Sequence, residues 1–579
     1  GQTYIYAAFA DTREYAYWYD QSGNNNDWTS NGGLTESDVM LDSPTNNFAT
    51  LNPLIIRSGE TGSDFSEGNL TASGASEYSA ATIEIPASGK FYTEAYVTLA
   101  GTSTANVGLN YPSDVQTNTS TNRVIYTSST GDIRINATAV ATGATYTTGD
   151  IIGVAADTIN GTVQFFKNNV SQGTATKDVS DMTIYLVHGG NWKFTMNFGQ
   201  DSSFAGTKTP QGNQDANSVG DFYYAPPTGF LALCTKSLPS VDVIPSENFN
   251  PVIYTGNGSS THAITNVGFT PDWVWGKQRN TARSHRLLDS VRGAGVYLAS
   301  DNTNAESSAS GLFKTFDSDG FTLDAANALN QSGGTYVAWN WKAGGSAVSN
   351  TNGTITSSVS ANPSAGFSIV ADEANGNVTS RGHGLASAPE MIIRKNRDSA
   401  RNWAVWHKDL TANYALEGLN TTGAQVSGGN PSKYFRDINS TTFSVGDDVS
   451  VNANGDSYIS YCFHSVESYS KVGSYTGNGS ATAGPFVHCG FRPAYVMYKN
   501  ANGTGNWGLL DNERNTYNPN DDWMAANLSN SESNESQRLI DFLSNGFKVR
   551  GTNGDVNTNG QTYIFLAFAE SPFKHTNAR

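Results

Sequence analysis

Eight histidines and three cysteines are the side chains of this 579-residue chain best suited to metal binding or nucleophilic chemistry. No two histidines have the His-x-x-x-His spacing that places two imidazoles on one helix face, and no Cys-x-x-Cys pair occurs. We therefore expect no metal, no cofactor and at most one disulfide. The residues concerned are His188, His262, His285, His383, His407, His464, His488 and His575, with Cys234, Cys462 and Cys489.

One acidic turn resembles the start of a calcium loop. Asp317-Ser-Asp319-Gly320 offers two carboxylates, but a complete loop needs further oxygen ligands and a bidentate Glu at its twelfth position. Phe321-Thr-Leu follows directly and is typical of a strand, and the equivalent turn near the C-terminus, Ser544-Asn545-Gly546, has no carboxylate. We predict a plain turn at this position.

The remaining motifs give no catalytic residue. No Gly-x-Ser-x-Gly elbow or phosphate-binding Walker loop stands in a strand–turn–helix context. The 51 acidic residues offer many carboxylate pairs, and such a pair for glycoside hydrolysis can come from distant positions in the sequence. The ligand-binding residues are therefore unknown at this stage, and no catalysis is predicted.

Composition indicates the elements that carry these side chains. Charged residues make up only 15% of the chain, aromatic residues reach 11%, and 59 glycines are present, which is typical of a β-protein with many turns. The net charge of −17 argues against nucleic-acid binding, which needs clustered Lys and Arg. No run of 18 apolar residues occurs, so we expect no membrane insertion.

The C-terminal half repeats itself. The motif Tyr254-Thr-Gly-Asn-Gly258 returns unchanged at Tyr475–Gly479, 221 residues later, and a weaker copy lies around Phe367–Asn377, so the period is about 110 residues. A second landmark recurs in the same order and ends each time in lysine: Gly268-Phe-Thr-Pro-Asp-Trp-Val-Trp-Gly-Lys277, Ala386-Ser-Ala-Pro-Glu-Met-Ile-Ile-Arg-Lys395 and Gly490-Phe-Arg-Pro-Ala-Tyr-Val-Met-Tyr-Lys499.

Each repeat closes with a strand in which alternate residues are large and apolar. A period of two places these residues on one face of a sheet. We predict that they form the core of each sandwich rather than a ligand platform. The residues are Val337, Trp339, Trp341, Ile459, Tyr461, Phe463, Ile564, Leu566 and Phe568. His285, Trp403 and Trp507 occupy equivalent positions, and we predict a packing role for them too.

The first residues repeat this closing strand. Gly1-Gln-Thr-Tyr-Ile-Tyr-Ala-Ala-Phe-Ala10 is nearly identical to Gly560–Ala569. A lone strand leaves backbone groups unpaired, so we expect residues 1–10 to finish a preceding repeat that the sequence does not contain. Residues 11–60 are expected to form a loop-rich lead-in.

Residues 61–205 have the alternation of a separate β-domain. Its strand candidates are 81–85, 91–99, 123–126, 151–155, 163–166, 183–187 and 194–198, separated by Gly- and Asn-containing turns. The stretch Gly149–Asn169, with Gly-Asp before one strand, Asn-Gly between strands and Phe-Phe-Lys-Asn at the end, resembles the hallmark hairpin of SPRY (concanavalin-like) domains. Asn197-Phe-Gly-Gln200 resembles that family's closing strand. The resemblance implies a binding module, with a ligand read by variable loops.

The order of the whole chain resembles large tail or fibre proteins of bacteriophages of marine bacteria. The SPRY-like domain is followed by Gly229-Phe-Leu-Ala-Leu-Cys-Thr235, by the Tyr-Thr-Gly-Asn-Gly repeats and by Tyr563-Ile-Phe-Leu-Ala-Phe-Ala-Glu-Ser-Pro-Phe-Lys574. The resemblance implies a virion component that is a homotrimer and that contacts other virion tail proteins and a host cell-surface glycan or protein.

The predicted fold class is all-β, with an SPRY/concanavalin-like sandwich followed by three tandem β-sandwich repeats of about 110 residues. We place the sandwich and its linker at 61–245 and the repeats at 246–346, 347–468 and 469–579. The predicted function is extracellular, non-enzymatic attachment of a tail fibre to the host surface, in which several weak sites gain avidity together. The alternatives are a capsid-decorating or other structural virion protein, a bacterial surface adhesin, and a polysaccharide depolymerase. The last usually resembles a β-helix, whose rungs are far shorter than this repeat.

Overall fold

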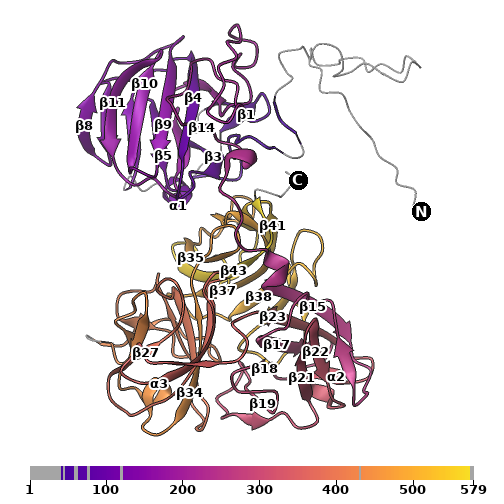
Figure 1. Ribbon diagram of the computed structural model, residues 1–579. Helices are drawn as coiled ribbons and strands as arrows, with labels where there is room; N and C mark the ends of the chain where they lie inside the picture. The colour runs from indigo at the N-terminus through magenta and orange to yellow at the C-terminus, as the bar shows by residue number, and fades with distance from the viewer. Residues whose placement is uncertain are drawn as a thin grey trace, which may run out of the picture. The chain divides into compact units, whose positions relative to one another are not determined.

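The computed structural model describes residues 41–43, 46–57, 63–74, 78–117, 122–429 and 432–573. The expected closing strand at 1–10, most of the lead-in at 11–60, and His575 lie outside the described residues. The chain divides into two compact units, Gly1–Pro239 and Ser240–Arg579 (Figure 1). Among the residues described, no helix has the length and apolar character needed to cross a membrane.

The first unit is a β-sandwich. Its eight-stranded sheet has the order β1 (Asp64–Ser66), β2 (Thr71–Ser73), β13 (Lys193–Asn197), β4 (Lys90–Leu99), β9 (Ile151–Asp157), β10 (Thr162–Lys167) and β11 (Val170–Thr176), and β14 (Leu231–Ala232) also pairs with β4. The six-stranded sheet has the order β3 (Tyr78–Glu84), β12 (Thr183–Val187), β5 (Asn106–Asn110), β6 (Val124–Thr127), β7 (Asp132–Ile135) and β8 (Thr138–Thr142). A short helix, α1 (Pro112–Thr117), follows β5. All seven strand candidates of this region are confirmed, each within a few residues.

The hairpin of β9 and β10 follows from local side-chain chemistry. Asp157 accepts hydrogen bonds from the backbone N–H and the side-chain amide of Asn160, at 3.0 and 2.7 Å, and so closes the turn. Gly161 has φ +61°, a left-handed conformation that glycine adopts without strain. Every residue of β9 is buried, as expected of a central strand.

The second unit contains three β-sandwich repeats, each with a large sheet and a three-stranded sheet. Repeat 1 has the orders β15 (Phe249–Thr255), β23 (Thr335–Trp341), β17 (Trp273–Gln278), β18 (Arg286–Asp289), and β16 (His262–Ile264), β22 (Gly320–Leu323), β21 (Phe313–Asp317). Repeat 2 has β24 (Val348–Asn350), β25 (Ser357–Asn362), β26 (Phe367–Glu373), β34 (Ser457–Phe463), β28 (Met391–Asn396), β29 (Ala404–His407), and β27 (Thr379–Gly382), β33 (Thr442–Val445), β32 (Phe435–Arg436). Repeat 3 has β35 (Ser470–Thr476), β43 (Thr562–Pro572), β37 (Phe491–Asn500), β38 (Gly508–Asp511), β39 (Asp522–Ala525), β40 (Ser533–Asn534), and β36 (Phe486–His488), β42 (Gly546–Val549), β41 (Ile540–Leu543).

Short elements complete the repeats. Two-stranded ribbons are formed by β19 (Val296–Tyr297) with β20 (Ser307–Ser308) and by β30 (Tyr414–Ala415) with β31 (Val426–Ser427). The helical turns α2 (Asn327–Asn330) and α3 (Val449–Asn452) precede the closing strands of repeats 1 and 2, while the 3₁₀ turns η2 (Thr235–Ser237) and η3 (Pro245–Glu247) lie in the connection to repeat 1.

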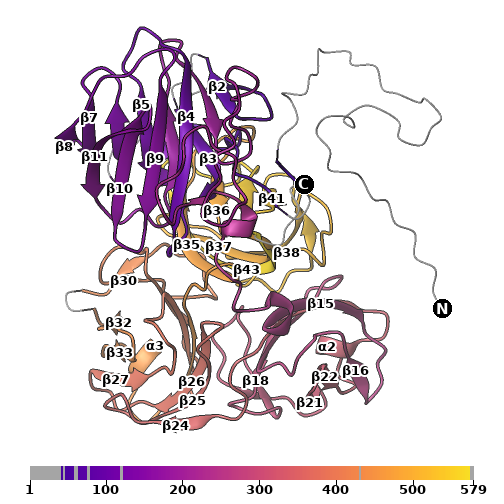
Figure 2. The same ribbon diagram turned by 45° about the horizontal axis from the view of Figure 1, so that its top comes forward.

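The closing strands β23, β34 and β43 lie inside the large sheets, and both of their faces are buried. One face packs against the three-stranded sheet of the same repeat, through residues such as Ala338 and Cys462. The other face carries the alternating apolar residues, and all nine belong to one core that the three repeats share. Figure 2 shows the repeats around this common centre.

This shared core corrects one expectation. The three sandwiches are present, but the aromatic residues of the closing strands do not form separate interiors. Rings from different repeats are in contact: Trp273 stacks on Tyr461 at 4.2 Å between ring centroids, and Phe249 stacks on Phe568 at 4.7 Å. Each large sheet therefore buries both of its faces. The alternation in the sequence shows which residues share a face, but it does not show whether one face or both faces are buried.

Candidate functional site

The three repeats meet at three seams that close a ring, and the seams gather the unit's buried polar side chains. We name each seam by the repeats that it joins. Three lysines lie at equivalent positions at the ends of the second landmark, Lys277, Lys395 and Lys499, and all are buried. Lys395 Nζ donates to the carbonyl of Thr303 across the 2–1 seam, at 3.3 Å, and Lys499 Nζ donates to that of Thr422 across the 3–2 seam, at 3.4 Å.

Each lysine also donates to the backbone carbonyl of the next residue, at 2.6 to 2.8 Å. Burial disfavours the charged ammonium and lowers the pKa of all three lysines to about 8. A buried amine with a lowered pKa is a possible nucleophile or base. These amines, however, donate to backbone carbonyl oxygens. Lys395 and Lys499 thereby tie neighbouring repeats together, whereas the hydrogen bond of Lys277 to Gln278 O stays within repeat 1.

The column of His285, Trp403 and Trp507 crosses the same seams. Trp403 Nε1 donates to Ala299 O of repeat 1 and Trp507 Nε1 donates to Gly418 O of repeat 2, both at 3.0 Å. His285 Nε2 lies 3.0 Å from Ala525 O of repeat 3. The predicted packing role is confirmed, and the contacts run from each repeat to the next around the closed ring.

Two seams carry matched ion pairs. Arg279 forms a bidentate pair with Glu532 at the 1–3 seam, and Arg397 forms the same pair with Glu306 at the 2–1 seam. A buried Asp–Arg pair lies behind each of them. Asp511 with Arg514, at 2.6 Å, lies behind Glu532, and Asp289 with Arg292, at 2.5 Å, lies behind Glu306. These aspartates accept from Tyr461 OH and Trp339 Nε1 of the neighbouring repeat.

The 3–2 seam differs. Ala501 and Gln425 occupy the positions of the Arg–Glu pair, so the seam keeps the backbone hydrogen bond from Gln425 N to Ala501 O and an amide contact from Gln425 to Asn502. His407 replaces the buried aspartate, and burial lowers its pKa to about 4. This imidazole is neutral at pH 7 and supplies no charge to the seam.

The Tyr-Thr-Gly-Asn-Gly motif is explained by packing. Tyr254 stacks on Tyr336 of the closing strand with centroids 5.0 Å apart, and Tyr475 stacks on Tyr563 at the same distance. A Cβ on Gly256 would lie 2.3 Å from Gln331 O, so only glycine fits there. The motif therefore shapes a turn, and its conservation between repeats needs no ligand.

A buried asparagine anchors this turn in every repeat. Asn330 donates to Ser259 O and accepts from Asn257 N, and Asn557 donates to Ser480 O and accepts from Asn478 N. Asn452 holds the equivalent turn of repeat 2 through Asn377 O. Sequence reasoning missed these anchors because they lie just before the closing strand, about 75 residues from the turns that they hold.

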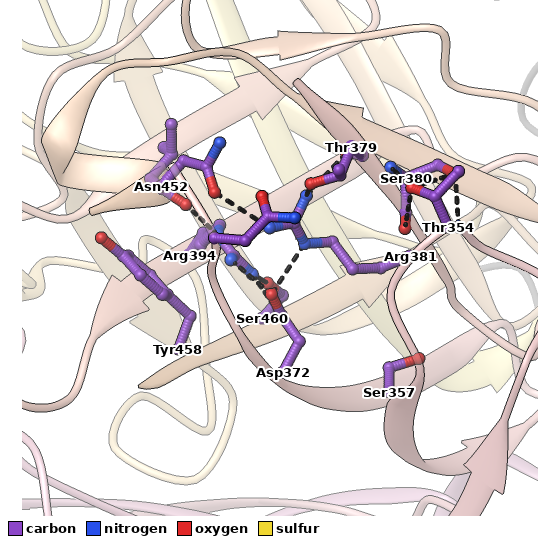
Figure 3. A network of polar contacts seen from close by, with 12 residues as sticks. Thr354, Ser357, Asp372, Thr379, Ser380, Arg381, Arg394, Asn452, Tyr458 and Ser460 are labelled. Atoms are coloured by element: carbon purple, nitrogen blue, oxygen red, sulfur yellow. Dashed lines mark hydrogen bonds and ion pairs between the residues drawn. The ribbon is translucent and has the colours of Figure 1, made fainter. Parts of the chain in front are cut away.

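Repeat 2 replaces the tyrosine stack with a buried charge cluster (Figure 3). Asp372 takes the position of Tyr254, and it accepts from Arg394 and Arg381, with closest distances of 2.7 Å to each. Arg394 Nε donates to Val451 O, and its guanidinium lies 4.3 Å from the ring centroid of Tyr458. Arg381 also donates to Asn452.

This cluster holds two guanidiniums against one carboxylate. Burial opposes ionisation of Asp372, but Arg394 and Arg381 together hold its pKa below the ordinary value. Burial lowers the pKa of Arg381 to about 10. All four side chains at the centre of Figure 3, including Tyr458, are inaccessible to solvent, so the cluster stabilises repeat 2 and has no open face for a ligand.

The first unit has one comparable carboxylate. Glu94 on β4 is fully buried and accepts from Tyr223 N and Tyr224 N, at 2.9 and 2.8 Å, and from the amide of Asn197. Burial raises its pKa to about 7. Glu94 thereby holds Tyr223 and Tyr224 next to β4, and Phe222 packs on Tyr92 of the same strand.

The residues singled out as candidates are not brought together. No group of three His, Cys, Asp or Glu side chains able to hold a metal occurs in the part of the chain that the structure describes. Asp319 accepts from Gly268 N and Asn266 N at 2.7 and 3.1 Å, which makes its turn a structural hairpin as predicted. The three cysteines are buried thiols, so the one disulfide that the count allowed is not formed.

Comparison with known proteins assigns both units. A family model described as a domain of unknown function (DUF7483) matches residues 244–572, and the SPRY domain model matches residues 90–201. No curated protein matches the chain. The region that resembles an SPRY domain is thus confirmed as one.

Several solved structures are similar to part of the chain. The SPRY domain of human HERC1 is 19% identical, covers 25% of this chain and 96% of its own, and gives a TM-score of 0.21. Stonustoxin is 19% identical, covers 26% of this chain and 27% of its own, with a TM-score of 0.22. A human SPRY domain is 21% identical, covers 22% of this chain and 90% of its own, with a TM-score of 0.20.

Proposed function

Since the chain belongs to the DUF7483 family, whose name assigns no activity, we propose a function from its own residues: it is an adhesive structural component of a bacteriophage tail appendage, a tail fibre. The proposal has the chain attach the particle to the host surface by multivalent, non-catalytic contacts. The order of its modules supports the phage setting, because it resembles that of fibre proteins of marine phages.

The main support for a non-catalytic function is that the chemically reactive side chains are enclosed in contacts between the repeats. Lys395, Lys499, the His–Trp column and the Asp–Arg pairs lie in contacts that close the ring. Groups enclosed in this way cannot reach a substrate, whereas a rigid ring can carry exposed loops at fixed positions. Rigid loops bind with little loss of conformational entropy, which suits weak sites that act together.

The experiment has two measurements, one on the purified full chain and one on virus particles. Fluorescently labelled chain is incubated with a panel of marine bacteria, and gold-labelled antibody against residues 240–579 is located on virus particles by electron microscopy. We expect binding to whole cells and gold at the tail tip. Gold on the capsid, or no cell binding by any strain, contradicts the proposal, and new reducing ends released from host glycan would indicate a depolymerase instead.

Self-association is part of the same proposal. We expect a homotrimer, so that light scattering should give three times the chain mass of 61.7 kDa. A monomeric mass at micromolar concentration would contradict this expectation, and it would leave cell binding to be judged separately.

A further inference from the structure

A segment of the first unit forms a strap beside β4. The chain leaves β4 after Asn197, which pairs with Glu94, and it pairs with β4 again only at Leu231. Residues 198–230 lie between these two points, and we call them the strap. Backbone pairing holds the chain at both ends of the strap, so its middle depends on attachments of another kind.

Side chains attach the middle of the strap to one face of β4. Phe222 packs on Tyr92 with ring centroids 5.2 Å apart, and Phe204 packs on Tyr96 at 5.4 Å. Tyr92, Glu94 and Tyr96 share this face because side chains alternate along a strand. Glu94 lies between the two ring contacts and accepts from the backbone N–H groups of two strap residues. Its carboxylate is therefore a polar anchor between two aromatic ones.

The hydrogen bonds to the Glu94 carboxylate come from neutral groups. Oε1 accepts from Tyr224 N at 2.8 Å and from Tyr92 OH at 3.4 Å. Oε2 accepts from Tyr223 N at 2.9 Å and from the amide of Asn197 at 3.2 Å. Among the residues that the structure describes, no cationic side chain forms an ion pair with this carboxylate. A buried carboxylate without a counter-charge is costly when it is ionised.

A proton on Glu94 removes this cost. Of the four donors, only the hydroxyl of Tyr92 can reverse its role and accept the proton of a neutral carboxyl. Burial outweighs the hydrogen bonds and raises the pKa of Glu94 to about 7. Burial also raises the pKa of Tyr92 and of Tyr224, so both phenols stay neutral in this range.

Charged groups on the surrounding elements have partners of their own. On the strap, Lys208 lies over the ring of Tyr96, 4.8 Å from its centroid. Next to β9, Asp150 pairs with Lys167 at 3.1 Å. The charge beneath the middle of the strap is therefore set by the proton of Glu94.

We propose that Glu94 is a proton-operated latch for the strap at residues 198–230. With its proton, Glu94 holds the strap on β4. Without the proton, the buried charge loosens the middle of the strap and uncovers the rings of Tyr92 and Tyr96. The strap is thus held more tightly in a weakly acidic medium than in a weakly alkaline one. This inference does not rest on the proposed attachment function, so either can fail without the other.

The test is hydrogen exchange of the full-length chain between pH 5 and 8, followed by mass spectrometry and corrected for the pH dependence of intrinsic exchange. The closed strap keeps the proton of Glu94 up to about pH 7, whereas the open strap loses it near the ordinary value of 4.5. The closed state therefore loses stability as the pH rises between these values. We expect protection of peptides that contain Tyr223 and Tyr224 to fall at least about tenfold from pH 5 to pH 8.

Two variants identify the group responsible. Glu94→Gln imitates the protonated side chain and should show no such fall in protection. Asp132→Asn is the matched control, because it removes a carboxylate that pairs with Arg134 on β7 of the other sheet. Its strap should respond to pH as that of the unchanged chain does.

The unchanged chain alone can overturn the inference, so the test does not depend on the folding of Glu94→Gln. Protection that stays constant, or that rises with pH, contradicts a latch closed by a proton. An equal fall in Glu94→Gln assigns the pH dependence to another group and overturns the inference as well. Infrared difference spectra between the unchanged chain and Glu94→Gln give an independent check. We expect the band of a protonated carboxyl at pH 5 and its loss at pH 8, and absence of the band at pH 5 contradicts the proposal.

Discussion

At the scale of single residues, the second unit holds charges where most proteins place apolar groups. In the cluster of Figure 3, Arg381 and Arg394 both pair with one carboxylate, that of Asp372. An ion pair out of water gains little over an apolar replacement, but removal of one partner leaves an uncompensated buried charge.

We expect Asp372→Asn to lower the free energy of unfolding by about 3–5 kcal/mol, because Arg381 and Arg394 would then lie buried without a counter-charge. The matched control is Asp437→Asn in the same repeat, which breaks the exposed pair with Arg436 and should cost at most about 1 kcal/mol. Chemical denaturation measures both changes. Similar losses in the free energy of unfolding for the two variants would show that the charge of Asp372 does not stabilise the buried cluster.

The seam lysines predict a dependence of stability on pH. Their folded pKa of about 8 lies below the ordinary value of 10.5, so between these values the unfolded chain binds a proton that the folded chain does not. Stability should therefore rise with pH from about 8, by about 1.4 kcal/mol per pH unit for each lysine. Above pH 10 the buried tyrosines, whose pKa values are raised, act in the opposite direction.

The measurement is denaturation of the full chain between pH 8 and 10, with Lys499→Met as the comparison. In the variant, the slope of the free energy of unfolding against pH should be smaller by about the contribution of one lysine. An unchanged slope would mean that Lys499 stays charged in the folded chain.

At the scale of elements, the seams are built from equivalent loops and strands, but not with equal strength. The 1–3 and 2–1 seams each join an Arg–Glu pair to a buried Asp–Arg pair, and the 3–2 seam has Ala501, Gln425 and His407 instead. Regions with fewer stabilising contacts open first in the native state.

We predict that the ring opens first at the 3–2 seam. The amides of Gln425, Glu306 and Glu532 make the same backbone hydrogen bond across the three seams, at 2.8 Å in each case. Native-state hydrogen exchange should show the amide of Gln425 exchanging faster than those of Glu306 and Glu532. Equal protection of all three amides would contradict the prediction.

Much at this scale was predictable from the sequence. Alternation placed the closing strands, and the position shared by His285, Trp403 and Trp507 indicated packing. The lysines were visible at the end of each landmark but were not recognised as ties, because their partners Thr303 and Thr422 lie in other repeats.

At the scale of the whole molecule, the shared core decides which pieces can fold alone. Repeat 1 contributes Trp273, Trp275, Trp339 and Trp341 to that core, and all four are nearly inaccessible in the ring. An isolated repeat would expose these side chains to water, where each loses roughly 1.5–3 kcal/mol of burial free energy, taking the figure for a large apolar side chain.

We expect residues 240–579 to fold as one cooperative unit and residues 246–346 alone to stay unfolded or aggregate. Circular dichroism and proton NMR of the two fragments measure this difference. Residues 1–239, which form their own compact unit, are the control and should fold. A dispersed NMR spectrum from residues 246–346 would show that each repeat is an independent domain.

The sequence by itself determined the all-β class, the SPRY sandwich with seven of its strands, and the three repeats with their closing strands. These properties are local, because side-chain alternation, turn residues and repeated motifs are written within a few residues of one another. Only the tertiary structure decided that three closing strands face one centre, that lysines and aspartates tie neighbouring repeats, and that one seam lacks its ion pair. Those features depend on residues tens to hundreds of positions apart, and alternation along a strand says which residues share a face but not what that face meets.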